Sequence, residues 1–320
     1  MARPSSPVER SPSRTVSPAG FRRITLAVLV TQVIIVLTGA AVRLTGSGLG
    51  CSDWPNCEED RFVPATDFNA VIEFVNRLMS FPVLVAVVLA VWAAGRRVPF
   101  RSDLRTLSWA ILGGVVVQVL LGAVVVRLEL LPSTVIVHFL ISMGLIALAV
   151  VLHHRAGSDL PRHATPGGWR PTASTSLMIP LALMSAAVLA AGTVVTAAGP
   201  HGGDENADRL PVFLPTATRV HSLAAWAFLA LLVVVLVLLR RERAPQVVHR
   251  CGTIVLVTCL IQGGIGYLQY WNGVPAGLVF LHVAGAMAVW GTTLWFVLEH
   301  RRLASTTTTT AAATATAGSS

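Results

Sequence analysis

Eight long runs of apolar residues follow one another along the chain, separated by short polar segments. Each run has roughly 20 residues, which as an α-helix with a rise of about 1.5 Å per residue is enough to cross the ~30 Å hydrocarbon core of a bilayer. The pattern therefore predicts an all-α integral membrane protein with eight transmembrane helices. The predicted spans cover residues 23–42, 70–94, 106–127, 134–154, 176–198, 219–240, 247–268 and 276–299.

Composition agrees with the hydropathy pattern. Of the 320 residues, 54% are hydrophobic and only 12% are charged, whereas soluble domains usually carry about 25% charged residues. The formal net charge of +9 is therefore interpreted by its position between the spans. No nucleic-acid-binding motif is found, so the partner that composition implies is the lipid bilayer and not DNA or RNA.

The two sets of connecting segments differ in charge. Most arginines fall in one set, whereas the other set is rich in aspartate and glutamate. Because cytoplasmic loops carry the excess of basic residues, the pattern predicts a multi-pass protein of a bacterial cell membrane with both termini in the cytoplasm. The basic set comprises Arg22, Arg23, Arg96, Arg97, Arg101, Arg105, Arg155, Arg162, Arg170, Arg240, Arg241, Arg243, Arg250, Arg301 and Arg302.

Three segments have the composition of tails or linkers. Residues 1–20 are rich in Ser, Pro and Arg, and residues 301–320 in Thr and Ala. Such biased segments bury too little apolar surface to fold. We therefore predict two disordered cytoplasmic tails, and a cytoplasmic linker over residues 156–175.

An internal repeat connects the spans on either side of this linker. Gln118 precedes His138 by 20 residues and Gln262 precedes His282 by 20 residues, so that both members of the second pair lie 144 residues after those of the first. Four spans in each half give both halves the same orientation. The repeat predicts two pseudo-symmetric four-helix bundles, an N-terminal half over residues 21–155 and a C-terminal half over residues 176–300.

Four polar residues lie near the outer start of the four spans that run inward. They are Asn76, His138, His221 and His282, two in each half, and the predicted topology places them at one depth. Paired imidazoles on facing helices are suited to binding a haem iron. The alternative is that these histidines cap helices or lie at the lipid interface.

Charged residues accompany this predicted site. Glu73 shares a helix face with Asn76, where a carboxylate can act as a base, a nucleophile or a cation stabiliser; a glutamate favoured by the helix dipole is the alternative. Arg77 and Arg219 lie at the same depth and can bind haem propionates, or extend to the interface as lipid-facing arginines do.

The remaining candidate residues are cysteines and histidines. Cys51 and Cys57 lie close together in the first outer loop, in an oxidising compartment, and form either a disulfide or a redox-active thiol pair. Cys251 and Cys259 are eight positions apart on one helix, too far for a bond, and are predicted to be packing residues. Five histidines in or beside basic segments are predicted to be solvated: His153, His154, His163, His249 and His300.

One stretch resembles a known family. Residues 38–55 read TGAAVRLTGSGLGCSDWP, and Ile72-Glu73 and Ala217-Thr218-Arg219-Val220-His221 follow later. These motifs resemble the haem A synthases of the cytochrome oxidase assembly pathway, and the likeness extends over about residues 20–300. The resemblance implies an enzyme that oxidises the C8 methyl group of haem O to a formyl group, with oxygen taken from water.

The resemblance also assigns roles. It implies a haem b cofactor in the C-terminal half, held by His221 and His282 with Arg219 nearby, and a substrate haem in the N-terminal half. Glu73 corresponds to the essential carboxylate, and Cys51 with Cys57 to the outer-loop cysteine pair. The substrate haem is expected near His138, Asn76, Arg77 and Arg43.

This chain departs from the family at one position, because Asn76 stands where many members have histidine. A neutral amide is a poor iron ligand, so His138 is expected to bind the substrate haem alone. The resemblance makes haem O synthase (protohaem farnesyltransferase) and a second copy of the chain candidate partners.

Two other classes of protein remain open. A b-type haem electron-transfer subunit would use the same histidines without needing Glu73 or the cysteine loop. A transporter would also show a repeat, but with spans broken at mid-membrane.

Overall fold

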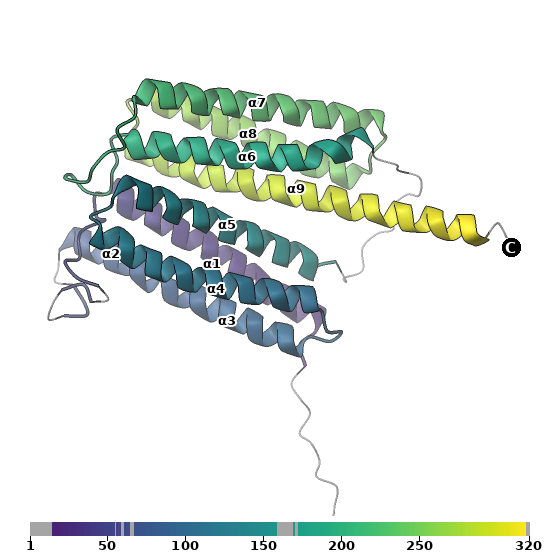
Figure 1. Ribbon diagram of the computed structural model, residues 1–320, viewed down its shortest axis with the longest axis horizontal. Coiled ribbons are helices and arrows are strands. Elements are labelled where there is room, and N and C mark those ends of the chain that lie inside the picture. Colours follow the sequence, from purple (N-terminus) through teal and green to yellow (C-terminus); the bar gives the residue numbers. More distant parts are fainter. Residues whose placement is uncertain are drawn as a thin grey trace, which may run out of the picture.

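The computed structural model describes residues 15–54, 56–58, 61–64, 67–158, 169 and 172–317, with side chains as far as residue 305. This part of the chain consists of helices joined by short loops, and α1 starts at the same end of the molecule at which α9 ends (Figure 1). The helices are α1 (Pro18–Leu44), α2 (Phe68–Leu78), α3 (Ser80–Arg96), α4 (Ser102–Arg127), α5 (Pro132–Ala156), α6 (Ala173–Ala198), α7 (Leu214–Arg241), α8 (Gln246–Trp271) and α9 (Ala276–Ala317).

The prediction of eight membrane-spanning helices is confirmed. Eight helical stretches are long and apolar enough to cross a membrane, and each predicted span lies inside one of them. The second span, Phe68–Arg96, combines α2 and α3, which meet at Met79. The observed helices extend beyond the apolar runs because polar residues at their ends still make helical hydrogen bonds.

The structure differs from the predicted tails at both ends. Helix α1 begins at Pro18, where the side chain of Ser17 accepts a hydrogen bond from the Gly20 amide (3.1 Å). Helix α9 continues to Ala317, through an alanine-containing segment that the sequence predicts to be unstructured; alanine has the highest helix propensity of all residues. The predicted tail before residue 15 and most of the predicted linker lie outside the described residues.

Buried apolar side chains form two large clusters, one in each half of the sequence. The first includes residues between Phe21 and Ala156, and the second residues between Trp169 and Leu303. A third cluster joins the halves through Val36, Met143, Ile146, Val150 and Met287. Figure 1 accordingly shows α6, α7, α8 and α9 as one group and α1 to α5 as another.

Two tight turns support the predicted repeat. The α4–α5 turn contains Glu129 (φ 48°) and Leu130 (φ 61°), and the α8–α9 turn contains Gly273 (φ 73°) and Val274 (φ 59°). In both turns the second of these residues donates its amide to a carbonyl five positions earlier, at 2.9 and 2.7 Å. The two turns lie 144 residues apart, which is the offset of the predicted repeat.

The end of the molecule where α1 starts and α9 ends contains buried histidines. His154 on α5 is 4% exposed and its Nε2 lies 2.9 Å from Glu299 Oε2 on α9, whose Oε1 accepts from Arg302 (2.6 Å). His300 is fully buried and lies 3.0 Å from the hydroxyl of Ser174. The prediction that His154 and His300 are solvated is therefore wrong. Their partners come from distant helices, and these partners offset the cost of burial.

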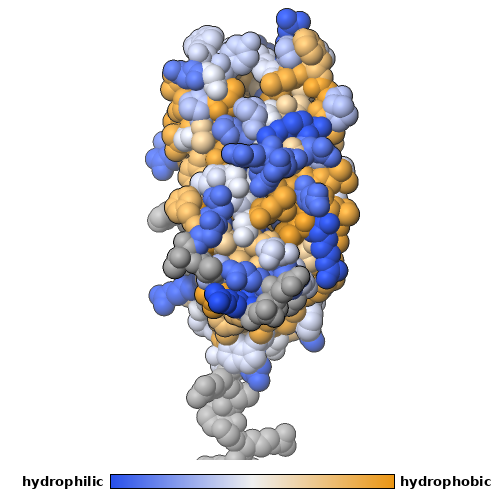
Figure 2. Space-filling view, turned by 90° about the vertical axis from the view of Figure 1, so that its left-hand side faces the viewer, coloured by the Kyte–Doolittle hydropathy of each residue, from blue (hydrophilic) through white to orange (hydrophobic). Residues whose placement is uncertain are grey.

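The opposite end, which we call the loop end, carries the loops after α1 and α6 and the turns before α5 and α9. Figure 2 views the molecule from this end and shows hydrophilic residues gathered across the middle of the face, with hydrophobic residues beside them. Helices α2, α5, α7 and α9 all begin there (Figure 1), so residues in their first turns share one depth.

Candidate functional site

The four predicted site residues lie close to the loop end. Asn76 is the ninth residue of α2, His138 the seventh of α5, His221 the eighth of α7 and His282 the seventh of α9, counted from the helix starts. At about 1.5 Å per residue, each lies roughly 10 Å from the start of its helix. The structure therefore agrees with the predicted common depth.

The two histidines of the C-terminal half face each other. The ring centroids of His221 and His282 are 6.2 Å apart, with an angle of 75° between the ring planes. Two imidazoles on opposite sides of one metal, each with its nitrogen at about 2 Å, have centroids roughly 6 Å apart. No Cα atom of α7 lies within 8 Å of one in α9, so the side chains, rather than the backbones, meet here. The spacing fits a pair of axial haem ligands.

Glycines on the preceding helices lie against these rings. A Cβ atom at Gly192 of α6 would lie 3.1 Å from His221 Cε1, and one at Gly266 of α8 would lie 3.1 Å from His282 Cε1. In the N-terminal half, a Cβ at Gly122 would lie 3.6 Å from His138 Cε1. The glycines allow close approach of the neighbouring helix, so that each imidazole ring packs against a glycine of that helix. We call this packing the cradle, and it fits imidazoles that are held in place to bind a planar ligand.

We predict that Gly266→Ala weakens haem binding several-fold, because the added methyl group displaces the His282 ring from its position. Haem content of the purified protein, measured as the pyridine haemochrome, checks this result. Gly264→Ala is the matched control, since a Cβ at that position of the same helix meets no atom within 4 Å. The control should retain wild-type haem content and gain about 0.5–1 kcal/mol of helix stability. Equal haem content in both variants would contradict the cradle.

Hydrogen bonds hold the two rings in the C-terminal half. His221 Nδ1 lies 3.1 Å from the Val188 carbonyl oxygen, and His282 Nδ1 lies 3.0 Å from Gln262 Nε2. Such contacts to the second nitrogen fix the orientation of a ligating histidine. In each ring these contacts engage Nδ1 and leave Nε2 as the nitrogen that could bind a metal.

The N-terminal half offers a different pair of side chains. His138 Nδ1 is buried and has no hydrogen-bond partner among the described residues. Asn76 Oδ1 accepts a hydrogen bond from the Thr38 hydroxyl (2.8 Å), so the amide oxygen is already engaged. This half therefore presents one imidazole where the C-terminal half presents two.

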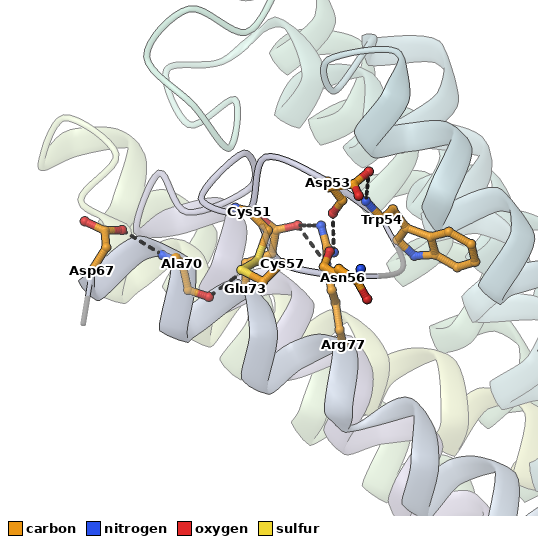
Figure 3. Close-up of a disulfide and its surroundings, with 9 residues drawn as sticks. All are labelled: Cys51, Asp53, Trp54, Asn56, Cys57, Asp67, Ala70, Glu73 and Arg77. Atoms are coloured by element: carbon orange, nitrogen blue, oxygen red, sulfur yellow. Dashed lines mark hydrogen bonds and ion pairs between the residues drawn. A yellow bond between two sulfur atoms is a disulfide. The ribbon is translucent and has the colours of Figure 1, made fainter. Parts of the chain in front are cut away.

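Glu73 is buried beside the loop between α1 and α2 (Figure 3). The residue is 3% exposed. One carboxylate oxygen accepts the Cys51 amide (2.9 Å), and the other accepts Arg77 Nε (3.0 Å) and Nη2 (2.5 Å). Both oxygens are thus occupied by protein donors, and a catalytic role requires one of these donors to give way to substrate.

Arg77 joins this carboxylate to the loop. Its Nη1 donates to the main-chain oxygens of Asp53 (2.8 Å) and Asn56 (2.9 Å), as Figure 3 shows. The loop is closed by a disulfide between Cys51 and Cys57, which confirms the predicted pairing. Helix α2, the ion pair and the disulfide loop form one connected unit.

The other cysteines behave as predicted. Cys251 and Cys259 are free and half-buried, and they pack against the apolar cluster of the C-terminal half.

Arg43 connects the two halves at the loop end. It extends from the last turn of α1, where Nε donates to the His201 carbonyl (2.7 Å) and Nη2 to the Thr196 carbonyl (2.9 Å). His201 Nε2 in turn lies 2.9 Å from the Val274 carbonyl in the α8–α9 turn. In contrast, the Arg219 side chain is exposed, and none of the hydrogen bonds among the described residues involves it. Of the predicted propionate-binding arginines, Arg219 is thus the one whose whole guanidinium is available.

We predict that Arg43→Gln lowers thermal stability, because the two carbonyls lose charged donors that contribute roughly 1.5–3 kcal/mol each. Unfolding of the protein in detergent, followed by circular dichroism, measures the loss. Arg209→Gln is the control: Arg209 donates to the Pro200 carbonyl (2.7 Å) within its own loop and should cost less. Lower haem content with unchanged stability would instead assign Arg43 to a propionate.

Comparison with known proteins agrees with this geometry. Residues 22–70 and 65–294 match the family described as cytochrome oxidase assembly protein. The chain belongs to this family. It is similar to curated proteins named Heme A synthase from Shewanella oneidensis (30% identity; 50% of this chain, 51% of the relative), Alkalihalophilus pseudofirmus (30%; 44% and 49%) and Symbiobacterium thermophilum (32%; 41% and 43%). The chain spans about half the length of the curated relatives it matches.

In this cytochrome oxidase assembly protein, the region that matches the family, residues 22–294, contains every candidate site residue discussed above. The sequence predicted that Asn76, His138, His221 and His282 lie at one depth, but it did not predict the hydrogen bond between Arg43 and the His201 carbonyl.

Proposed function

We propose that this chain is a haem A synthase that oxidises the C8 methyl group of haem O to a formyl group, with water as the source of oxygen. The observation that carries the proposal is the pair of facing imidazoles, His221 and His282, in a member of the cytochrome oxidase assembly protein family. The names of the bacterial relatives support the same activity.

In this proposal the C-terminal half holds haem b as a resident cofactor. His221 and His282 would hold its iron, and the exposed Arg219 would bind a propionate. When bound, haem b would supply one-electron redox chemistry, passing the four electrons removed from the methyl group one at a time to an external electron acceptor. The chain contributes the fixed ring orientations from Val188 and Gln262.

The N-terminal half receives haem O. His138 is the imidazole available to the substrate iron, and Asn76, on α2, contributes an amide rather than a second ligand. Glu73 is the proposed catalytic carboxylate, which stabilises positive charge at the oxidised methyl carbon or accepts its proton. Arg77 and Arg43 remain candidates for the substrate propionates only if they release the carbonyls that they bind in this structure.

The setting of the reaction is also part of the proposal. The distribution of arginines supports a cytoplasmic position for both termini, and with this orientation the proposed site lies near the outer face. Haem O synthase is the proposed supplier of the substrate, and a homo-oligomer is the proposed assembly.

Analysis of cellular haems tests the activity. Cells that lack this chain should accumulate haem O, and expression of the chain should convert it to haem A. The unit formed by Glu73, Arg77 and the disulfide loop favours an enzyme over a b-type electron-transfer subunit, which has no need of it. If haem A levels do not depend on the chain, whereas its haem b is reduced by a copurifying dehydrogenase, the electron-transfer function is correct.

A further inference from the structure

A glutamine on the preceding helix supports one site histidine in each half. Gln118 Nε2 on α4 donates to the main-chain oxygen of His138 (2.9 Å), and Gln262 Nε2 on α8 donates to that of His282 (2.8 Å). Both pairs are 20 residues apart in sequence, and each joins two helices that are connected by the same type of tight turn. The two halves therefore contain matching glutamine–histidine pairs.

The second contact of each glutamine differs. In the N-terminal half, the same amide donates to Ser142 Oγ (2.5 Å), whose hydroxyl donates to the His138 main-chain oxygen (2.9 Å). In the C-terminal half the residue 144 positions later is Ala286, which has no hydroxyl. There, Gln262 Nε2 instead lies 3.0 Å from His282 Nδ1. In the C-terminal half the glutamine thus contacts the imidazole ring, whereas in the N-terminal half it contacts a serine hydroxyl instead.

The consequence for the two rings follows from imidazole chemistry. A histidine that binds a metal through Nε2 carries its proton on Nδ1, which needs a hydrogen-bond acceptor. Gln262 Oε1 is buried without a partner among the described residues. In this structure it is Nε2 that lies 3.0 Å from Nδ1; the terminal torsion of glutamine is broad, and its rotation would bring Oε1 to Nδ1 instead. Gln262 can therefore hold the His282 ring in the ligating state.

The His138 ring has no such support. Its Nδ1 is without a partner among the described residues, and the amide nitrogen of Gln118 contacts Ser142 Oγ and the His138 main-chain oxygen rather than the ring. A ring without this second contact turns more readily, and its bond to a metal is weaker. Loss of such a supporting hydrogen bond typically costs 10–100-fold in metal affinity.

We propose that the residue at positions 142 and 286 sets how firmly each half retains its haem. With Ala286 beside it, Gln262 contacts the His282 ring, and a firmly held ring suits a resident cofactor. In the N-terminal half Gln118 contacts the Ser142 hydroxyl instead of the His138 ring, and a less firmly held ring suits a substrate that must leave after reaction. This inference rests on the proposed function, because it assumes that both halves bind haem. Ser142 and Ala286 are positioning residues, since each acts through a glutamine.

Exchanging the two residues tests the proposal. Haem loss from the purified full-length protein in detergent is followed as transfer to excess apomyoglobin. Ala286→Ser is expected to release haem b about tenfold faster than the wild type, by the lower bound for such supporting contacts. Ser142→Ala is expected to slow release of haem from the N-terminal half by a similar factor, seen as a higher haem-to-protein ratio after purification.

Two further variants and the wild-type protein complete the test. Ala288→Ser adds the same hydroxyl to an exposed position of α9 and should lose haem at the wild-type rate. Gln262→Leu removes both contacts and should lose haem b at least as fast as Ala286→Ser. Wild-type release rates in Ala286→Ser and Gln262→Leu overturn the inference while leaving the proposed function intact. A wild-type protein that purifies without haem b after full haem supply overturns the proposed function itself.

Discussion

Replacing His282 with methionine should change the haem spectrum of the purified protein and raise the reduction potential of haem b. A methionine–histidine pair of axial ligands gives a higher potential than two histidines, and axial ligands set haem potentials over a range of about 0.8 V. We expect a rise on the order of 100 mV. Optical redox titration measures it, and the same samples give the change in the visible bands.

His138→Met is the matched control for this experiment, because His138 occupies the corresponding position of the N-terminal half. Its haem b spectrum and potential should equal those of the wild type, whereas formation of haem A should fall. An unaltered spectrum in His282→Met would reject the assignment of this residue as a ligand, and with it the interpretation of the 6.2 Å spacing between the rings of His221 and His282.

Glu73→Gln should leave haem b bound and reduce formation of haem A by about 10²–10⁴-fold, the usual contribution of a positioned acid or base. The amide of glutamine still accepts the Cys51 N–H, but it cannot neutralise Arg77. The measurement is the ratio of haem A to haem O extracted from cells that express the variant, together with the haem b content of the purified protein.

A second variant separates catalysis from support of the loop. Arg77→Gln breaks the same ion pair and removes the two donations to the loop carbonyls, but it keeps the carboxylate. If Glu73 acts on the substrate, Arg77→Gln retains much more activity than Glu73→Gln. Equal losses of activity and of thermal stability in the two variants would show that Glu73 only holds the disulfide loop.

The helices could be predicted from the sequence because a bilayer imposes one length on every span. Each of the eight apolar runs lies inside an observed helical stretch, the second of which combines α2 and α3, and the errors concern the ends, where α1 starts at Pro18 and α9 continues to Ala317. Hydropathy does not predict these ends, because a helix can continue through residues that are not apolar.

The sequence places Asn76, His138, His221 and His282 near the starts of four spans, and the structure has each of them near the start of a helix. The rings of His221 and His282 lie 6.2 Å apart, whereas their role as haem ligands stays a prediction. The partners of charged and polar side chains were not predictable in the same way. His154 meets Glu299, 145 residues later, and Arg43 meets His201, 158 residues later; nothing local in the sequence records such contacts, since they depend on how the helices are arranged.

These long-range contacts restrict the route by which a large ligand reaches its pocket. Arg43 ties the halves together at one end of the molecule, and His154 with Glu299 ties them together at the other. Separating the two halves to admit a large ligand would therefore break contacts at both ends of the molecule.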